Sequence, residues 1–281
     1  MPRLLVVLLL GGLLAPPMSA APAGAAPKAE QWARWERHDP SSTARVDHGA
    51  WARFLQLYLR RGGDGIARVD YGAVTAADLR ELAGYVASLA EVPVSRLNRG
   101  EQMAYWINLY NALTVRAVLE RYPVKSIRDI DISPGLFSRG PWGKKLVAVE
   151  GEPVSLDDIE HRILRPIWRD PRVHYAVNCA SLGCPDLLPR PLAAHDLDHA
   201  LDMAAIAFVN HPRGVRVEDG ELLVSSIYVW FEEDFGGDAA GVIRHLMAYA
   251  DPDLAMRLQQ LKEIGGDSYD WRLNDAGQGD R

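Results

Sequence analysis

The sequence predicts a helix-rich α+β protein with a small, mainly antiparallel sheet. Apolar residues recur at helical spacing through most of the longer segments, and short runs of β-branched residues are bounded by turn residues. Hydrophobic residues make up 48% of the 281-residue chain and charged residues 24%, which is close to ordinary globular usage. The chain can therefore bury a sizeable core, in one large domain or two small ones.

The N-terminal residues have the pattern of an export signal. Arg3 is followed by an apolar stretch of 12 residues, 4–15, and then by small residues at 19–26 that offer cleavage sites. A membrane-spanning helix needs about 20 apolar residues, which makes a retained anchor the weaker hypothesis. We expect a signal peptide at 1–25, a periplasmic or secreted mature protein, and no membrane span after cleavage. The Ala-, Pro- and Ser-rich residues 26–47 are expected to form a linker.

Helical patterns account for most of the chain after this linker and for one short segment within it. The best defined helix begins after Asn98, an N-cap residue, and Glu101 three positions later completes a capping-box pattern. This helix is apolar nearly all round, so we expect it to be buried. The helical segments that the patterns predict are 30–37, 51–59, 77–89, 98–122, 156–164, 197–208 and 239–250.

Four short strands are expected between these helices, and an exposed tail is expected after the last helix. Residues 215–217 and 222–224 are separated by a segment with an Asp-Gly pair, which favours a tight hairpin. Residues 145–149 precede a glycine turn and have the pattern of a strand. Residues 173–177 are apolar and are expected to form a strand that leads into the two cysteines of the chain.

The run after this strand contains both cysteines, and three hypotheses fit it. In an oxidising compartment, Cys179 and Cys184 are candidates for a disulfide. Together with His174 they have the spacing H-x4-C-x4-C, although no second close-spaced ligand pair supports a metal site. In the third hypothesis one cysteine is a nucleophile, which needs a thiolate near neutral pH from a thiol whose free pKa is about 8.5.

Cys179 is the better candidate nucleophile of the two. It nearly adjoins the expected strand, which would fix its position, and the backbone N–H groups after it could form an oxyanion site. The base is open between two histidines. His174 and Cys179 are an odd number of residues apart, so they would point to opposite faces of an unbroken strand. His161 is therefore a competitor for the role of base.

Glu160 falls inside the apolar arc of its predicted helix, at about 100° per residue, and His161 lies on the flank of that arc. A carboxylate that faces the core is costly unless a cation or several donors meet it. One hypothesis is a buried ion pair with Arg165, Arg169 or Arg172. The alternative is that Glu160 holds an imidazole, as the third member of a Cys-His-acid set.

The other polar candidates lie on the buried helix and beside the thiol. Glu101, Asn108 and Asn111 fall close to one stripe of the helix, and each buried polar side chain must find a partner. The structural hypothesis is that Glu101 completes the helix cap and the two amides hold neighbouring loops. The functional hypothesis is that these residues and Asn178 bind or orient a substrate, with Asn108 near an oxyanion.

Several of these segments together resemble one family, the domain of unknown function DUF547. The motifs that carry the resemblance are 105–113 (YWINLYNAL), 155–161 (SLDDIEH), 174–181 (HYAVNCAS) with Cys184-Pro185, 225–231 (SSIYVWF) and 269–274 (YDWRLN). The resemblance implies a single helix-rich α+β domain over 48–275, followed by a tail at 276–281. It also implies a proposed relation to papain-like or transglutaminase-like thiol enzymes. The thiol site would then map to Cys179, with Glu160 and a histidine.

We expect a cysteine-dependent hydrolase or acyltransferase that acts on amide or peptide bonds. Cys179 would attack the carbonyl carbon, and His174 or His161 would move the proton while Glu160 holds the imidazole. The expected partner is a peptide or another small molecule with an amide, and this chemistry needs neither a cofactor nor a metal. The net charge of −6 and the lack of a basic run with aromatics argue against a nucleic-acid partner. The alternative is a non-catalytic binding domain with a Cys179–Cys184 disulfide.

Overall fold

The computed structural model describes residues 27–135 and 139–278. The expected signal peptide, 1–25, lies outside the described residues. The helices are α1 (Gly49–Tyr58), α2 (Ala76–Ala90), α3 (Arg99–Leu119), α4 (Arg165–Trp168), α5 (Leu197–Val209), α6 (Ile227–Trp230), α7 (Ala239–Tyr249) and α8 (Pro252–Leu258). The strands are β1 (Leu59–Arg61), β2 (Ala67–Val69), β3 (Val147–Val149), β4 (Glu152–Val154), β5 (Val215–Glu218), β6 (Glu221–Ser225) and β7 (Gly266–Ser268).

The helix-rich α+β prediction is confirmed, with short strands that pair mainly antiparallel. The strands form three small sheets rather than one: the hairpins β1–β2 and β3–β4, and a three-stranded sheet in the order β5-β6-β7. Only β7 runs parallel to its neighbour, β6. Within the described part of the chain, no helix combines the length and the apolar character that crossing a membrane requires.

Helix α3 forms the centre of the larger of two hydrophobic clusters. The side chain of Asn98 caps it by accepting a hydrogen bond of 3.0 Å from the N–H of Glu101. Nearly every side chain of the helix is buried, as its apolar sequence predicts, and α2 and a neighbouring π-helix pack against it. Glu101 does not complete the capping box, because its carboxylate accepts the N–H of Val46 at 2.7 Å instead.

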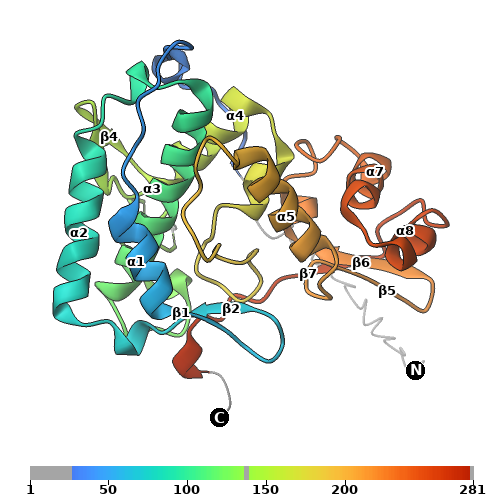
Figure 1. Cartoon of the computed structure of the whole chain (residues 1–281). Helices are drawn as coiled ribbons and strands as arrows, with labels where there is room; N and C mark the ends of the chain where they lie inside the picture. Colours follow the sequence, from blue (N-terminus) through green and yellow to red (C-terminus); the bar gives the residue numbers. More distant parts are fainter. Residues whose placement is uncertain (1–26, 136–138, 279–281) are drawn as a thin grey trace, which may run out of the picture.

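The second hydrophobic cluster lies beside the first and is built by α5, α7, α8, β5 and β6. Figure 1 shows these elements on one side of the molecule and α1, α2 and α3 on the other. The segment before Cys179 contributes to both clusters, since Tyr175 packs in the second, whereas Val173 and Val177 pack in the first. The residues that precede the thiol are therefore fixed at the boundary between the two clusters.

The prediction of a strand at 173–177 is wrong, because Pro171–Tyr175 forms a 3-10 helix. Two local features explain this. The carboxylate of Asp170 accepts the N–H of Arg172 at 2.9 Å and caps the turn, and Pro171 fixes φ at its first position. Side chains of this segment therefore do not alternate between two faces as they would in a strand. The argument from strand faces against pairing His174 with Cys179 no longer applies.

The helix expected at 156–164 has an unusual hydrogen-bond pattern, since Asp158–Leu164 forms a π-helix that continues into α4. A π-helix has more residues per turn than an α-helix, so neighbouring side chains are spread differently around the axis. Glu160 and His161 are both buried, and both line the same cavity. Irregular turns of this kind are frequent at functional sites.

Residues 27–48 pack against the rest of the molecule, although the sequence favours a linker there. The N–H groups of Glu30 and Trp32 donate to the carbonyls of His161 and Arg162 at 3.0 and 2.9 Å. Trp35 is buried, with its ring centroid 5.0 Å from that of an α3 tryptophan. This segment therefore covers the π-helix that carries two of the candidate site residues.

The expectation of an exposed tail after residue 250 is also wrong. After α8, strand β7 pairs with β6, and the following residues lie against the cysteine segment. The N–H groups of Leu182 and Gly183 donate to the carbonyls of Arg272 and Asp270 at 2.8 and 2.9 Å. Gly183 is needed for this approach, because a Cβ there would lie only 2.7 Å from the backbone nitrogen of Asp270.

The buried amide of Asn111 connects α3 to the chain just before Cys179. Its Nδ2 donates to the carbonyl of Ala176 at 2.9 Å, and its Oδ1 accepts the N–H of Asn178 at 2.8 Å. Both bonds are buried, so neither backbone group could turn to water if the amide were absent. Asn111 therefore substitutes for the hydrogen bonds that a strand would have supplied.

We predict that Asn111→Leu lowers the free energy of unfolding by roughly 2–5 kcal/mol, because it leaves two buried backbone groups unsatisfied. Thr114→Val, on the same helix, is the matched control. The Thr114 hydroxyl is buried without a hydrogen-bond partner among the described residues, so its removal should cost nothing or stabilise the protein. Urea denaturation of both variants measures the difference. Equal effects of the two substitutions would contradict this role of Asn111.

Candidate active site

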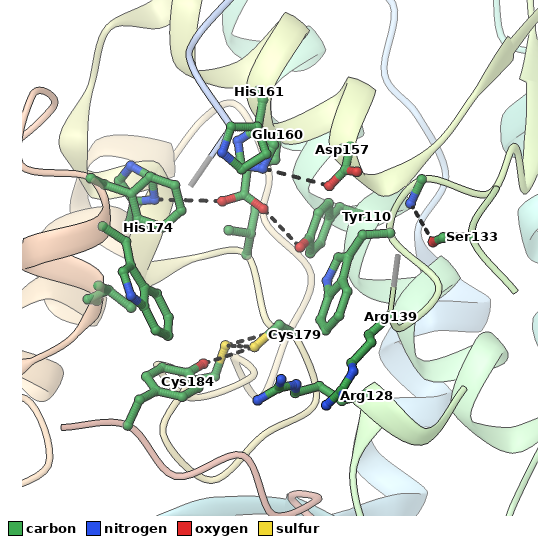
Figure 2. A pocket seen from close by; sticks show the side chains of 18 of the residues that line it. Tyr110, Arg128, Ser133, Arg139, Asp157, Glu160, His161, His174, Cys179 and Cys184 are labelled. Carbon is green, nitrogen blue, oxygen red and sulfur yellow. Dashed lines mark hydrogen bonds and ion pairs between the residues drawn. The ribbon is translucent and has the colours of Figure 1, made fainter. Parts of the chain in front are cut away.

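A cavity of about 520 Å³ lies between the two hydrophobic clusters. Its volume is in the range of small-molecule sites. All four residues that the sequence proposes for catalysis line it: Cys179, His174, Glu160 and His161. Figure 2 shows Glu160 and His161 on one side of the cavity, His174 beside them, and Cys179 facing the same space. The fold therefore gathers side chains from the π-helix, the 3-10 helix and the cysteine turn.

The half-buried thiol of Cys179 is surrounded by hydrogen-bonding groups. Its Sγ lies 3.0 Å from Tyr269 Oη, 3.1 Å from Ser181 Oγ and 2.8 Å from Cys184 Sγ. Burial by itself raises the pKa of Cys179, but the hydrogen bonds from Cys184, Ser181 and Tyr269 outweigh burial and lower it. The ionised form is thus stabilised by neutral donors. In the described part of the chain, no histidine is hydrogen-bonded to this sulfur.

Cys184 has the opposite electrostatic character. It is buried, and burial together with the neighbouring Cys179 raises the pKa of its thiol well above the usual value. Its protonated sulfur can donate to Cys179 Sγ, and it accepts the N–H of Cys179 at 2.9 Å. Both cysteines are free in this structure. Of the two thiols, Cys179 is therefore the more readily ionised.

The backbone after Cys179 does not supply the open oxyanion site that the sequence suggests. Five N–H groups in this turn already have acceptors: Cys179 to Cys184 Sγ, Ala180 to Asn178 Oδ1, Leu182 and Gly183 to the C-terminal segment, and Cys184 to the Ser181 carbonyl. Ala180 has φ of +58°, a left-handed conformation that is strained for a residue with a Cβ. The turn is therefore rigid, and a developing oxyanion would need donors from elsewhere in the cavity.

His174 lies between two carboxylates. Its Nε2 is 2.7 Å from Asp234 Oδ2, and its Nδ1 is 3.8 Å from Glu160 Oε1. The imidazole stacks on the ring of Phe231, with 4.2 Å between centroids. Burial raises the pKa of Asp234, but the hydrogen bonds from His174 and Arg165 are stronger and lower it to about 2. Asp234 is therefore ionised near neutral pH, and its full negative charge holds His174 in place.

Glu160 is held by a hydroxyl rather than by an arginine. Tyr110 donates to its Oε2 at 2.9 Å, and its other oxygen faces His174. Arg165 instead binds Asp234 and Glu233, and no arginine forms an ion pair with Glu160 in residues 27–135 or 139–278. This geometry favours the hypothesis that Glu160 interacts with an imidazole, that of His174, rather than with an arginine.

His161 is less suited than His174 to be a base. Its Nδ1 lies 3.2 Å from Arg165 Nη1, which must be the donor, and its Nε2 is 3.8 Å from Asp157 Oδ1. Burial lowers the pKa of His161, and the charge of Arg165 adds to that effect. Burial and the nearby charges of Glu160 and Asp158 raise the pKa of Asp157 to about 6. His161 is thus a neutral ring that already uses one nitrogen as an acceptor.

The four residues proposed for substrate binding do not line the cavity. Asn108 binds both the N–H and the carbonyl of Leu192, at 3.0 and 2.9 Å. Asn111 holds the segment before Cys179, Glu101 accepts a backbone N–H, and Asn178 donates to the Pro185 carbonyl at 2.8 Å. The contacts of Asn108 and Asn111 match the structural hypothesis, in which the amides hold neighbouring loops, whereas Glu101 binds Val46 instead of completing the helix cap.

Several residues of the site have no clear signal in the sequence. Asp234 and Tyr110 contact the proposed acid-base pair, whereas Tyr269 contacts the thiol from 90 positions away. Tyr110 and Tyr269 lie in the motifs at 105–113 and 269–274 that resemble DUF547, so those motifs were the available clues. Asp234 lies in an acidic stretch, and only the fold shows which of its carboxylates faces inward.

No group of three or more His, Cys, Asp or Glu side chains positioned to hold a metal ion occurs in the described ranges, 27–135 and 139–278. His174, Cys179 and Cys184 therefore do not form the metal site considered from their spacing.

A family model also matches the chain. The model is that of DUF547, described as a protein of unknown function, and it matches residues 94–209. The matched residues include α3, the π-helix and both cysteines, so most of the site lies within the matched part of the chain. The motifs at 225–231 and 269–274 lie beyond the matched residues. No curated protein and no solved structure matches the chain.

We predict that Tyr269→Phe raises the pKa of Cys179, because it removes a hydroxyl that stabilises the thiolate at 3.0 Å. The thiolate fraction at a given pH then falls, so the pH profile of alkylation by iodoacetamide moves to higher pH. Tyr122→Phe is the control, since its hydroxyl binds Asp275 rather than the thiol. Identical pH profiles for wild type and Tyr269→Phe would contradict this account of the thiolate.

Proposed function

We propose that this protein is a cysteine-dependent hydrolase or acyltransferase that acts on amide or peptide bonds. The observation that carries the proposal is the Cys179 thiol. It faces a cavity, its pKa is lowered by three hydrogen-bond donors, and an imidazole held by carboxylates lines the same cavity. Partial exposure and a lowered thiol pKa are features of reactive cysteines, whereas buried structural cysteines are usually inert.

In the proposed reaction, the Cys179 thiolate attacks the carbonyl carbon of the amide and forms an S–C bond. The C–N bond then breaks, and the leaving amine takes a proton. Water, or another nucleophile in a transfer reaction, next attacks the thioester and loses its proton. The Cys179 thiolate is thereby released.

His174 is the proposed proton donor and acceptor for these steps. Its Nε2 is occupied by Asp234, which leaves Nδ1 on the side of Glu160 and the cavity. Because His174 is not hydrogen-bonded to Cys179, we assign it to the leaving amine and the attacking water rather than to activation of the thiol. The neutral donors around Cys179 carry out that activation.

The pattern at 1–25 supports a place of action outside the cytoplasm, and we propose a periplasmic or secreted enzyme. A second candidate function is a non-catalytic binding domain with a Cys179–Cys184 disulfide. The short distance of 2.8 Å between the two sulfurs favours it, because little movement would be needed to join them.

An activated ester tests the enzyme proposal. With p-nitrophenyl acetate, we expect rapid acetylation of Cys179, detected by mass spectrometry, followed by turnover. Cys179→Ala should lose both, whereas the matched variant Cys184→Ala should still become acetylated. Hydrolysis that is equally fast in wild type and Cys179→Ala, or acetylation confined to Cys184, would contradict the proposal.

His174→Ala separates the two halves of the same reaction. We expect this variant to be acetylated at Cys179 and to lose the acetyl group at least about tenfold more slowly, since general base catalysis typically contributes 10²–10⁴-fold. Deacetylation at the wild-type rate would remove His174 from the mechanism while leaving Cys179 in place.

A further inference from the structure

We infer that Arg128 and Arg139 form a subsite for a carboxylate next to the thiol, so that the substrate is an amide whose acyl part carries a negative charge. This inference rests on the proposed function and names its substrate class. Both arginines line the cavity. Figure 2 shows their side chains reaching into it on the side of Cys179, away from Glu160 and Asp157.

Arg128 is held in place without being neutralised. It belongs to the 3-10 helix Ile127–Asp129, which a capping box formed by Ser126 and Asp129 closes. The neighbouring carboxylate of Asp129 therefore accepts a hydrogen bond of 3.0 Å from the backbone N–H of Ser126. The guanidinium of Arg128 lies over the ring of Trp271, 5.0 Å from its centroid. Such stacking orients a guanidinium and leaves its N–H donors available.

Neither guanidinium has a carboxylate partner among residues 27–135 and 139–278. Arg128 is half-buried and Arg139 is exposed, whereas the buried Arg165 and the half-buried Arg172 and Arg213 form ion pairs. Arg128 is half-buried and lies over an aromatic ring without a carboxylate beside it. A planar guanidinium in this situation is suited to bidentate binding of a carboxylate.

A row of aromatic rings places Arg128 close to the thiol. Trp271 lies under its guanidinium, the ring of Tyr269 is 4.6 Å from that of Trp271, and Tyr269 Oη is 3.0 Å from Cys179 Sγ. Trp142 and Trp230 extend this wall, with centroids 6.0 and 5.6 Å from Trp271. The apolar wall lowers the local dielectric, which strengthens the attraction between Arg128 and an anion.

The opposite side of the cavity carries the carboxylates of Glu160 and Asp157. The cavity is therefore polarised, with negative groups beside His174 and positive groups beside Cys179. An amide bound across it would place its acyl part, with the carboxylate, towards the arginines and its leaving amine towards His174. This orientation agrees with the proton transfer that we assign to His174.

Two alkylating agents with the same reactive carbon test the subsite. In both iodoacetate and iodoacetamide, the thiolate displaces iodide from a CH₂ group and forms a C–S bond, but only iodoacetate carries a carboxylate. We expect the ratio of the iodoacetate rate to the iodoacetamide rate at Cys179 to exceed the ratio measured for mercaptoethanol. Arg128→Gln should lower that ratio about tenfold, since hydrogen bonds to charged groups contribute roughly 1.5–3 kcal/mol.

Arg139→Gln should lower the ratio as well, and Arg80→Gln, on an exposed position of α2, is the matched control that should not change it. A wild-type ratio no higher than that of mercaptoethanol, with a normal iodoacetamide rate, would overturn the subsite and leave the proposed function intact. Failure of iodoacetamide to modify Cys179 at all would overturn both. The two outcomes are thus distinguishable in one experiment.

The carboxylate of a peptide substrate has two sources, the C-terminus and an acidic side chain. Protection of Cys179 from iodoacetamide by acetyl-Ala-Ala supports a terminal carboxylate, and protection by acetyl-Glu-amide supports a side-chain carboxylate. In either case Arg128→Gln should weaken the protection. Protection that persists unchanged in Arg128→Gln, or that neither compound provides, would overturn the assignment of a carboxylate-bearing substrate.

Discussion

The hydrogen bonds of the buried Asn111 amide are the constraint on which the site depends. They join the central helix α3 to the backbone on both sides of Val177, where no strand is present to hold the chain. The C-terminal segment completes this constraint from the opposite side through backbone hydrogen bonds to Leu182 and Gly183. The cysteine turn is thus held between the first helix-rich part of the chain and its last residues, which gives the left-handed Ala180 the support that a strained conformation needs.

The electrostatics of the site follow from how this turn is held. Cys179 is placed beside a phenol, a hydroxyl and a second thiol, and these neutral donors favour its ionised form. His174 is placed among carboxylates, one of which binds it directly. The thiol and the imidazole are therefore held separately, and both line the same cavity. This arrangement differs from a thiolate–imidazolium pair in direct contact, and it is the reason why we propose that His174 acts on the leaving amine and on water.

Much of the fold could be predicted from the sequence, because helix periodicity, N-caps and the Asp-Gly hairpin are local signals. The wrong predictions at 173–177 and after residue 250 have non-local causes. The segment 173–177 is apolar like a strand, but Asp170 and Pro171 start a 3-10 turn and Asn111 supplies its tertiary bonds. After residue 250, the short helix α8 packs in the second cluster, and the later segment pairs with β6 and with the cysteine turn.

The site could be predicted in part. Cys179, His174, Glu160 and His161 were identifiable because a thiol, imidazoles and an inward-facing carboxylate are unusual on apolar segments, and all four line the cavity. The sequence could not show whether the buried amides have a structural or a substrate-binding role. A polar side chain on a buried helix uses the same atoms to bind the backbone or a ligand. Asp234, Tyr269 and Arg128 come from distant segments, so only the tertiary structure reveals their place.

The central claim is that the resting protein contains a free, ionisable thiol at Cys179. Titration of thiols in the purified protein, unfolded without reductant, tests it most directly. We expect two reactive thiols per chain, as in the structure, where both cysteines are free. A count of zero, restored to two by reduction, would show that Cys179 and Cys184 are bridged in the resting protein and would contradict the claim.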